Sequence, residues 1–224
     1  MELILGIAII AAGVALGLAQ RGSIANALAW RPKGVPLIAL WLVVHLMLLA
    51  VVDAGPVWVF LDIVACLGLV VAVAANSRVP GTVIVAAGLG LNLVVSVLNW
   101  GTPASLGALI DAGVVPEDAT AATHVLTGPR FINDGSAWLG FLGETIALPT
   151  GSVISIGDVI VAVGVVLTVA AALTGKYRRN RPYQQSIAPL GRGPAPRRGP
   201  GLHPSRLDQG PGSPAQQQRD RRTR

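Results

Sequence analysis

The sequence is poor in the residues that soluble enzymes and disulfide-stabilised proteins depend on. Only 12% of its 224 residues are charged, whereas a soluble domain usually carries about a quarter charged residues. The single cysteine, Cys66, excludes an intramolecular disulfide and a thiolate zinc site. H-E-x-x-H, G-x-S-x-G, Walker and C-x-x-C motifs are also missing. These absences argue against an ordinary water-soluble enzyme, and no cofactor is predicted.

Long apolar runs are abundant instead, with 52% hydrophobic residues and a mean hydropathy of +0.63. At about 1.5 Å per residue, a helix of such a run spans a hydrocarbon core of about 30 Å. Only a helix pairs its own backbone polar groups in lipid. The predicted fold class is therefore an all-α integral membrane protein in the cell membrane. Its five transmembrane helices are expected at residues 3–19, 35–52, 57–75, 81–98 and 153–173.

The connection at residues 100–152 differs from the short turns between the other spans. It contains a candidate short helix at Ala119–Thr127, followed by Gly-Pro and Asp-Gly turn signals. Trp138 and Phe141 make it too apolar for a free loop. We expect a partly structured segment that folds back onto the helix ends.

Charge is divided unequally along the chain. Residues 1–175 hold five basic and nine acidic side chains, whereas residues 176–224 hold twelve basic and two acidic ones. The Arg-, Pro- and Gly-rich composition predicts a disordered tail. Because Lys and Arg mark cytoplasmic segments, the tail is expected inside and both the N-terminus and the 100–152 loop outside.

The tail predicts contact with anionic lipids at the membrane exit rather than nucleic-acid binding. Apart from Tyr177 and Tyr183 it has no aromatic side chains on which bases would stack. The residues expected at the lipid surface are Lys176, Arg178, Arg179 and Arg181.

Several polar side chains fall within or beside the spans, where lipid disfavours them. Asn92 and Asn99 share one face of the fourth span with Ser96, and Asp62 and Asp158 lie near the expected outer surface. They serve either as hydrogen-bonding partners between helices or as a ligand site. The predicted polar cluster comprises Asp62, Asn92, Asn99, His124, Glu144 and Asp158.

Two histidines leave alternatives open. His45, in the second span, is interpreted as a neutral hydrogen-bonded side chain or as a proton relay. His124 lies among carboxylates, but no ligand pair has a recognisable metal spacing, so the metal question stays open.

Four groups of residues, read in order, resemble a known family. They are Asn92 and Asn99, Gly101 to Pro103, Leu142-Gly143-Glu144 to Pro149, and Ser155-Ile156-Gly157-Asp158. The pattern resembles a bacterial membrane-protein family known only as domain of unknown function 5317, over about residues 1–175. The chain departs from it at Trp100, Thr102 and Glu144. The resemblance implies the fold and one outer-face constellation, but no activity.

Three functions compete on these observations. The first is a small membrane protein that binds a ligand, or passes a solute, at a polar outer-face site. The second is a membrane scaffold that acts through its basic tail, with a membrane partner or a second copy of itself. The third is an intramembrane aspartyl hydrolase, because Ser155-Ile156-Gly157-Asp158 nearly matches G-x-G-D and Asp62 supplies a second carboxylate.

Overall fold

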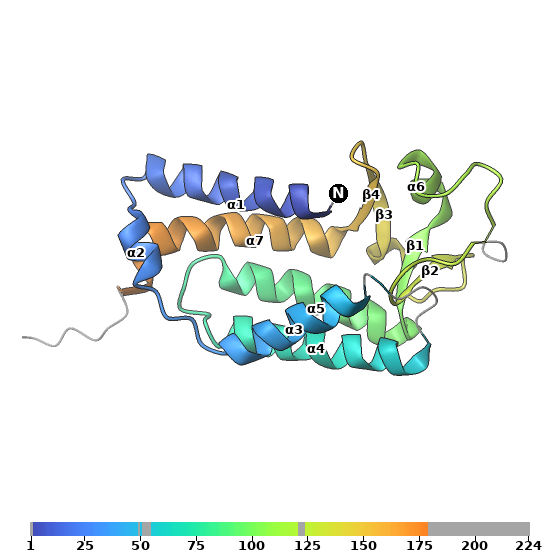
Figure 1. Ribbon diagram of the computed structural model, residues 1–224, viewed down its shortest axis with the longest axis horizontal. Helices are drawn as coiled ribbons and strands as arrows, with labels where there is room; N and C mark the ends of the chain where they lie inside the picture. Colours follow the sequence, from blue (N-terminus) through green and yellow to red (C-terminus); the bar gives the residue numbers. More distant parts are fainter. Residues whose placement is uncertain (1, 49, 51–54, 121–123, 179–224) are drawn as a thin grey trace, which may run out of the picture. The chain divides into compact units, whose positions relative to one another are not determined.

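The computed structural model describes residues 2–48, 50, 55–120 and 124–178 of the chain (Figure 1). Most of this part is a helical bundle, which carries a small sheet at one end, here called the sheet end. A short helix, α2 (Ile24–Leu28), and a 3-10 turn, η2 (Lys176–Arg178), lie at the opposite end, here called the basic end. The long helices are α1 (Glu2–Ala19), α3 (Val35–Leu48), α4 (Pro56–Ala74), α5 (Thr82–Asn99) and α7 (Ile156–Leu173).

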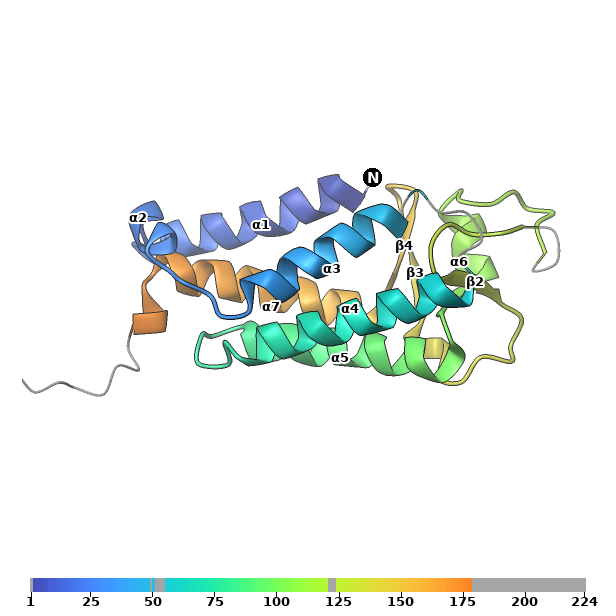
Figure 2. The same cartoon turned by 60° about the horizontal axis from the view of Figure 1, so that its bottom comes forward.

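Helix α7 lies between α1 and α5, and glycines let both neighbours approach it closely. A Cβ added at Gly13 of α1 would lie 2.8 Å from Val169 Cβ, and one added at Gly17 would lie 2.6 Å from Leu173 Cδ1. Because both pairs of contacts advance in the same direction along the chain, α1 and α7 run parallel (Figures 1 and 2). The G-x-x-x-G of α1 is thus a packing motif.

Helices α5 and α7 run antiparallel and use a second set of glycines. A Cβ added at Gly81 would lie 2.5 Å from the carbonyl oxygen of Gly164, and one added at Gly88 would lie 2.5 Å from that of Gly157. Gly81 caps the start of α5 seven residues before Gly88, and Gly157 and Gly164 lie seven residues apart on one face of α7. This spacing brings the start of α7 against the second half of α5, where Asn92 lies.

The segment between α5 and α7 forms a cap with its own sheet and core. Its strands are β1 (Thr102–Ser105), β2 (Arg130–Asn133), β3 (Glu144–Leu148) and β4 (Ser152–Ser155), in the order β2-β1-β3-β4. The β1 strand pairs in parallel with β2 and β3, while β3 and β4 are antiparallel. Helix α6 (Leu106–Asp111) and a 3-10 turn, η1 (Gly140–Leu142), complete the cap. Its core contains Ala104, Leu109, Val115, Ile132 and Val153.

Three helices, α4, α5 and α7, are long and apolar enough to cross a membrane. Within the described residues, the apolar parts of α1 (Ile4–Ala19) and α3 (Val35–Leu48) are shorter than these three helices. Large apolar side chains point away from the bundle, which is the arrangement that hydrocarbon solvates. Examples, each about half exposed, are Ile10, Leu42, Phe60, Leu67, Val83 and Val163.

The expected start of the fourth span agrees with the structure to within one residue, whereas that of the fifth span does not. The fourth span was placed at 81–98 and the helix is Thr82–Asn99, whereas the fifth was placed at 153–173 and the helix begins at Ile156. Residues 153–155 belong to β4 instead, because the Ser155 side chain caps α7 and the preceding backbone pairs with β3. The end of the expected second span falls at residues 49 and 51–52, outside the described part.

The candidate helix at Ala119–Thr127 falls partly on residues 121–123, which lie outside the described part. Its described residues, 119–120 and 124–127, are not helical, and Ala119 and Leu126 are buried in the core of the cap. Trp138 and Phe141, whose apolar side chains predicted a structured segment, lie in the cap with 73% and 65% of their surface exposed.

Candidate functional site

A hydrogen-bonded group of three side chains joins α5 to the start of α7 at the sheet end. Asn92 Nδ2 donates to Asp158 Oδ1 at 2.7 Å. Ser155 Oγ lies 2.8 Å from Asp158 Oδ2 and 2.9 Å from Asn92 Oδ1. Ser155 is only 3% exposed. Each oxygen of the Asp158 carboxylate therefore has a fixed partner.

Local sequence explains why these groups meet. Ser155 and Asp158 form a capping box, in which the Asp158 N–H donates to Ser155 Oγ at 3.0 Å and the Ser155 N–H donates to Asp158 Oδ2 at 2.8 Å. This S-x-x-D arrangement satisfies backbone donors of the first turn of α7. Gly157 leaves room for Asn92, because a Cβ at residue 157 would fall on the Asn92 amide oxygen.

Beside this group is a cavity of about 140 Å³, here called the Asp158 cavity. It is lined by Asn92 of α5 and Asp158 of α7, and by Thr102, Glu144 and Ser155 from the strands of the cap. Thr102 is held by a 3.1 Å hydrogen bond between its hydroxyl and that of Ser96 on α5. The cavity therefore lies between the helix ends and the sheet.

A second cavity of about 190 Å³, here called the Asp62 cavity, is lined by Asp62 and His45 from the bundle. Thr102 and Glu144 line this cavity as well, so the two cavities adjoin at these side chains. Asp62 is half-buried, and no described residue hydrogen-bonds its carboxylate. The His45 ring stacks on Trp41, with 5.0 Å between ring centroids.

Glu144 is paired with Arg130 across the sheet. Arg130 Nη1 lies 3.3 Å from Glu144 Oε2, and their side chains are 24% and 13% exposed. Arg130 also donates to the carbonyl and hydroxyl oxygens of Thr127 at 3.3 Å. The charge of Glu144 is thus largely balanced by Arg130. Among the carboxylates that line these two cavities, Asp62 therefore has the fewest hydrogen-bond and ion-pair partners.

The remaining members of the predicted cluster lie elsewhere. Asn99 lines neither cavity; its side chain accepts from the Trp138 N–H at 2.7 Å and donates to the Trp138 carbonyl at 2.8 Å. It therefore fastens the cap to the end of α5. His124 is half-buried and also lines neither cavity. In the loop after β2, hydrogen bonds from Ser136 hold the pKa of Asp134 below its ordinary value.

No group of three or more His, Cys, Asp and Glu side chains suited to a metal occurs among the described residues. Of the expected lipid contacts, Lys176 donates to Gln20 Oε1 at 3.0 Å and Arg178 belongs to η2. Arg179 and Arg181 lie outside the described part of the chain.

Sequence reasoning missed Thr102 and Arg130 as site residues and treated His45 separately. A single threonine or arginine in a long connection carries no local signal, because its place depends on how the strands pair. The S-x-x-D spacing of Ser155 and Asp158 did offer a signal, since it is typical of a helix start.

The fold and these cavities define a mostly helical protein with three apolar helices long enough to cross a membrane and a polar site beside a small sheet. The chain belongs to a family of unknown function, DUF5317, whose sequence model matches residues 32–170. That stretch contains both cavities and the whole cap. No curated protein and no solved structure matches the chain.

Proposed function

We propose that this chain is a membrane protein that binds a small, positively charged solute in the Asp62 cavity. The observation that carries the proposal is a half-buried carboxylate, on a helix long and apolar enough to span a membrane, that no described residue hydrogen-bonds. A carboxylate taken out of water is costly unless it is paired. An ionisable residue within such a helix is a functional-site hypothesis by default.

The surrounding side chains suit a small polar cation. Thr102 and Thr127 line the Asp62 cavity with hydroxyl groups. Arg130 lines it as well, and its charge is paired with Glu144 while its other two nitrogens donate to Thr127. A volume of about 190 Å³ is below the roughly 300 Å³ at which drug-sized ligand pockets begin. An inorganic cation with some water, or a small ammonium compound, fits that size.

Binding is better supported than passage across the membrane. None of the described residues that line the Asp62 and Asp158 cavities also lines either of two cavities found at the basic end. A transport path needs continuity between the two ends. The aspartyl hydrolase alternative gains no support, because Asp62 and Asp158 line different cavities and Asp158 is held by its capping box.

The proposal includes a topology with five spans, the sheet end outside and the basic end in the cytoplasm. It is supported by the distribution of charge: Arg31, Lys33 and Arg78 gather at the basic end, as the positive-inside rule requires. The scaffold alternative depends on residues after 178, which lie outside the described part.

The test is thermal stability of the purified full-length protein in detergent. Sodium, potassium, calcium and methylammonium chlorides are added at matched ionic strength to wild type, Asp62→Asn and Asp118→Asn. Asp118 is an exposed acid of the cap, so its variant removes the same charge away from the cavity.

A cation bound at Asp62 raises the melting temperature of wild type and Asp118→Asn but not of Asp62→Asn, because a ligand stabilises only the form that binds it. If no cation separates Asp62→Asn from the other two proteins, the proposed site is wrong.

A further inference from the structure

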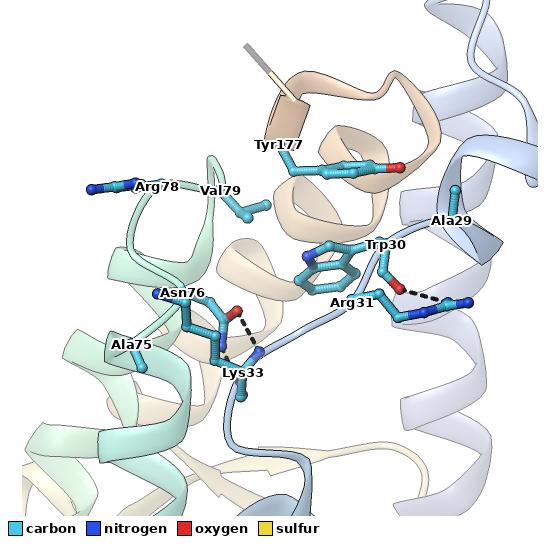
Figure 3. A pocket seen from close by; sticks show the side chains of 9 residues that line it. All are labelled: Ala29, Trp30, Arg31, Lys33, Ala75, Asn76, Arg78, Val79 and Tyr177. Carbon is cyan, nitrogen blue, oxygen red and sulfur yellow. Dashed lines mark hydrogen bonds between the residues drawn. The ribbon is translucent and has the colours of Figure 1, made fainter. Parts of the chain in front are cut away.

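The basic end of the bundle contains a cavity of about 540 Å³, here called the basic pocket (Figure 3). Three cationic residues line it: Arg31 and Lys33 precede α3, and Arg78 lies between α4 and α5. None of its described lining residues is acidic. All three cationic side chains are exposed, so each can turn toward an anion at the mouth of the pocket.

The walls of the basic pocket are held in place by the protein itself. The Asn76 side chain accepts from the Lys33 N–H at 2.9 Å and donates to the Lys33 carbonyl at 3.0 Å. Thr82, which is 3% exposed, donates to the Asn76 carbonyl at 2.8 Å. Figure 3 shows the Asn76 side chain against the Lys33 backbone. The connections before α3 and before α5 are therefore locked together.

Two aromatic side chains form another wall. The Trp30 and Tyr177 rings lie one above the other, with centroids 6.4 Å apart (Figure 3). Tyr177 Oη donates to the Asn26 carbonyl at 2.6 Å. Trp and Tyr are enriched where membrane proteins meet lipid headgroups, because their rings are apolar at one end and polar at the other.

The Arg31 guanidinium is placed by two backbone acceptors. Its Nη1 donates to the carbonyl oxygens of Leu28 at 2.8 Å and Trp30 at 3.3 Å. An arginine has five N–H donors, so others remain for a ligand. No described residue hydrogen-bonds the side chain of Lys33 or Arg78.

A second, apolar cavity of about 170 Å³ adjoins the basic pocket, and Trp30 and Asn76 line both. It is here called the apolar slot. Its other walls are almost entirely apolar and come from α3, α4, α5 and α7: Ile38, Val73, Val85, Val165 and Val169. A cationic pocket that continues into an apolar slot matches a molecule with an anionic head and a hydrocarbon tail.

We propose that the basic pocket and the apolar slot together bind one anionic phospholipid. Its phosphate pairs with Arg31, Lys33 and Arg78, and one acyl chain enters the slot between the helices. Basic pockets between membrane helices are a recognised place for anionic headgroups. A free phosphate would use only the charged half and leave the slot empty. The inference shares with the proposed function only the membrane embedding of the helices, since no lining residue is common to the two sites.

The experiment measures binding of dioctanoyl phosphatidylglycerol to the delipidated full-length protein in detergent by native mass spectrometry. The pocket variant Arg31→Gln/Lys33→Gln/Arg78→Gln is compared with the tail variant Arg192→Gln/Arg197→Gln/Arg198→Gln, which loses the same charge. Since each near-surface charge is worth about fivefold in affinity, the pocket variant should lose at least about tenfold and the tail variant much less. Equal losses would assign the binding to the tail and overturn the proposal.

A second comparison separates a lipid from a free phosphate. Val165→Phe fills the apolar slot, while Val163→Phe adds the same bulk at an outward position of α7 that is 51% exposed. Val165→Phe should weaken phosphatidylglycerol binding several-fold, and Val163→Phe should not. Inorganic phosphate that displaces the lipid at similar concentrations, or a lipid affinity untouched by Val165→Phe, would show a phosphate pocket without a lipid site.

Folding of each variant is checked by its melting temperature and gel-filtration profile. If the triple pocket variant does not fold, Arg78→Gln alone serves as the test, because no described residue hydrogen-bonds that side chain. It should weaken phosphatidylglycerol binding about fivefold. The outer-site variant Asp62→Asn should leave this binding unchanged, so failure of one site is distinguishable from failure of the other.

Discussion

Asn92 of α5 donates a 2.7 Å hydrogen bond to Asp158 Oδ1 of α7, while the other oxygen of Asp158 accepts from the Ser155 N–H. Both carboxylate oxygens therefore face donors. An asparagine at residue 158 must turn its NH₂ group toward one of them. Asp158→Asn should therefore destabilise the protein by about 1–3 kcal/mol, the usual cost of leaving a buried polar group unsatisfied. Its melting temperature in detergent should fall, whereas that of the exposed Asp111→Asn should not.

Exchanging the residue types at positions 92 and 158 gives a sharper test of this hydrogen bond. Asn92→Asp alone places two carboxylates in contact, and their repulsion should lower the free energy of unfolding at least as much as Asp158→Asn does. The double variant Asn92→Asp/Asp158→Asn restores one donor and one acceptor between α5 and α7. It should recover a large part of the lost stability, giving a coupling energy of about 0.5–3 kcal/mol in a double-mutant cycle. Simple additivity of the two losses would show that the hydrogen bond contributes little.

Glycine at residue 157 is required by packing. A Cβ there would fall on Asn92 Oδ1 and lie 2.9 Å from the Gly88 carbonyl oxygen. Gly157→Ala must push α5 and α7 apart, and overpacking of this kind costs about 1–3 kcal/mol or more. Gly90→Ala, on α5, is the matched control because nothing lies within 4 Å of its added Cβ. Thermal unfolding in detergent should separate the two variants, and equal melting temperatures would contradict the close approach of the helices.

The helices were largely predictable because their signal is local. A long apolar run placed the third and fourth spans at 57–75 and 81–98, and the structure has Pro56–Ala74 and Thr82–Asn99. The start of α7 was misplaced because the run of apolar residues begins before Ser155 caps the helix. Composition does not distinguish the last residues of a strand from the first turn of a helix.

The cap was only partly predictable, because its strands pair segments that are far apart in sequence. Strand β1 has four residues and pairs with β2, so Thr102 faces Arg130 only through that register. The spacing of apolar residues along the sequence does not predict which strands pair, or in which register. Helix geometry predicted Asn99, Asp158 and Asp62 near one level. In the structure the partner of Asp158 is Asn92, whereas Asn99 binds the Trp138 backbone.

Asn99 provides a test of how the cap is attached. Its amide makes two hydrogen bonds to the Trp138 backbone and one to the Val95 carbonyl at 2.8 Å. Asn99→Ala removes all three, so amide hydrogen exchange at Trp138 should accelerate while exchange within α5 changes little. Trp138→Phe is the control, because it keeps the backbone contacts and alters only a side chain that is 73% exposed. Unchanged protection at Trp138 in Asn99→Ala would mean that the cap is held by other contacts.

The proposed topology makes a prediction that can be checked in intact cells. Ser136 is exposed in the cap at the sheet end, and Ser77 is exposed in the turn between α4 and α5 at the basic end. In a Cys66→Ala background, which removes the single native thiol, Ser136→Cys should react with a membrane-impermeant thiol reagent and Ser77→Cys should not. Both should react once the membrane is permeabilised, which confirms that each thiol is accessible. The expectation follows from the positive-inside rule, which assigns the basic side chains that gather near Ser77 to the cytoplasmic side. If only Ser77→Cys is labelled, the orientation is the reverse of the one proposed and the cation site lies on the cytoplasmic side. If both variants are labelled equally in intact cells, the proposed orientation is wrong.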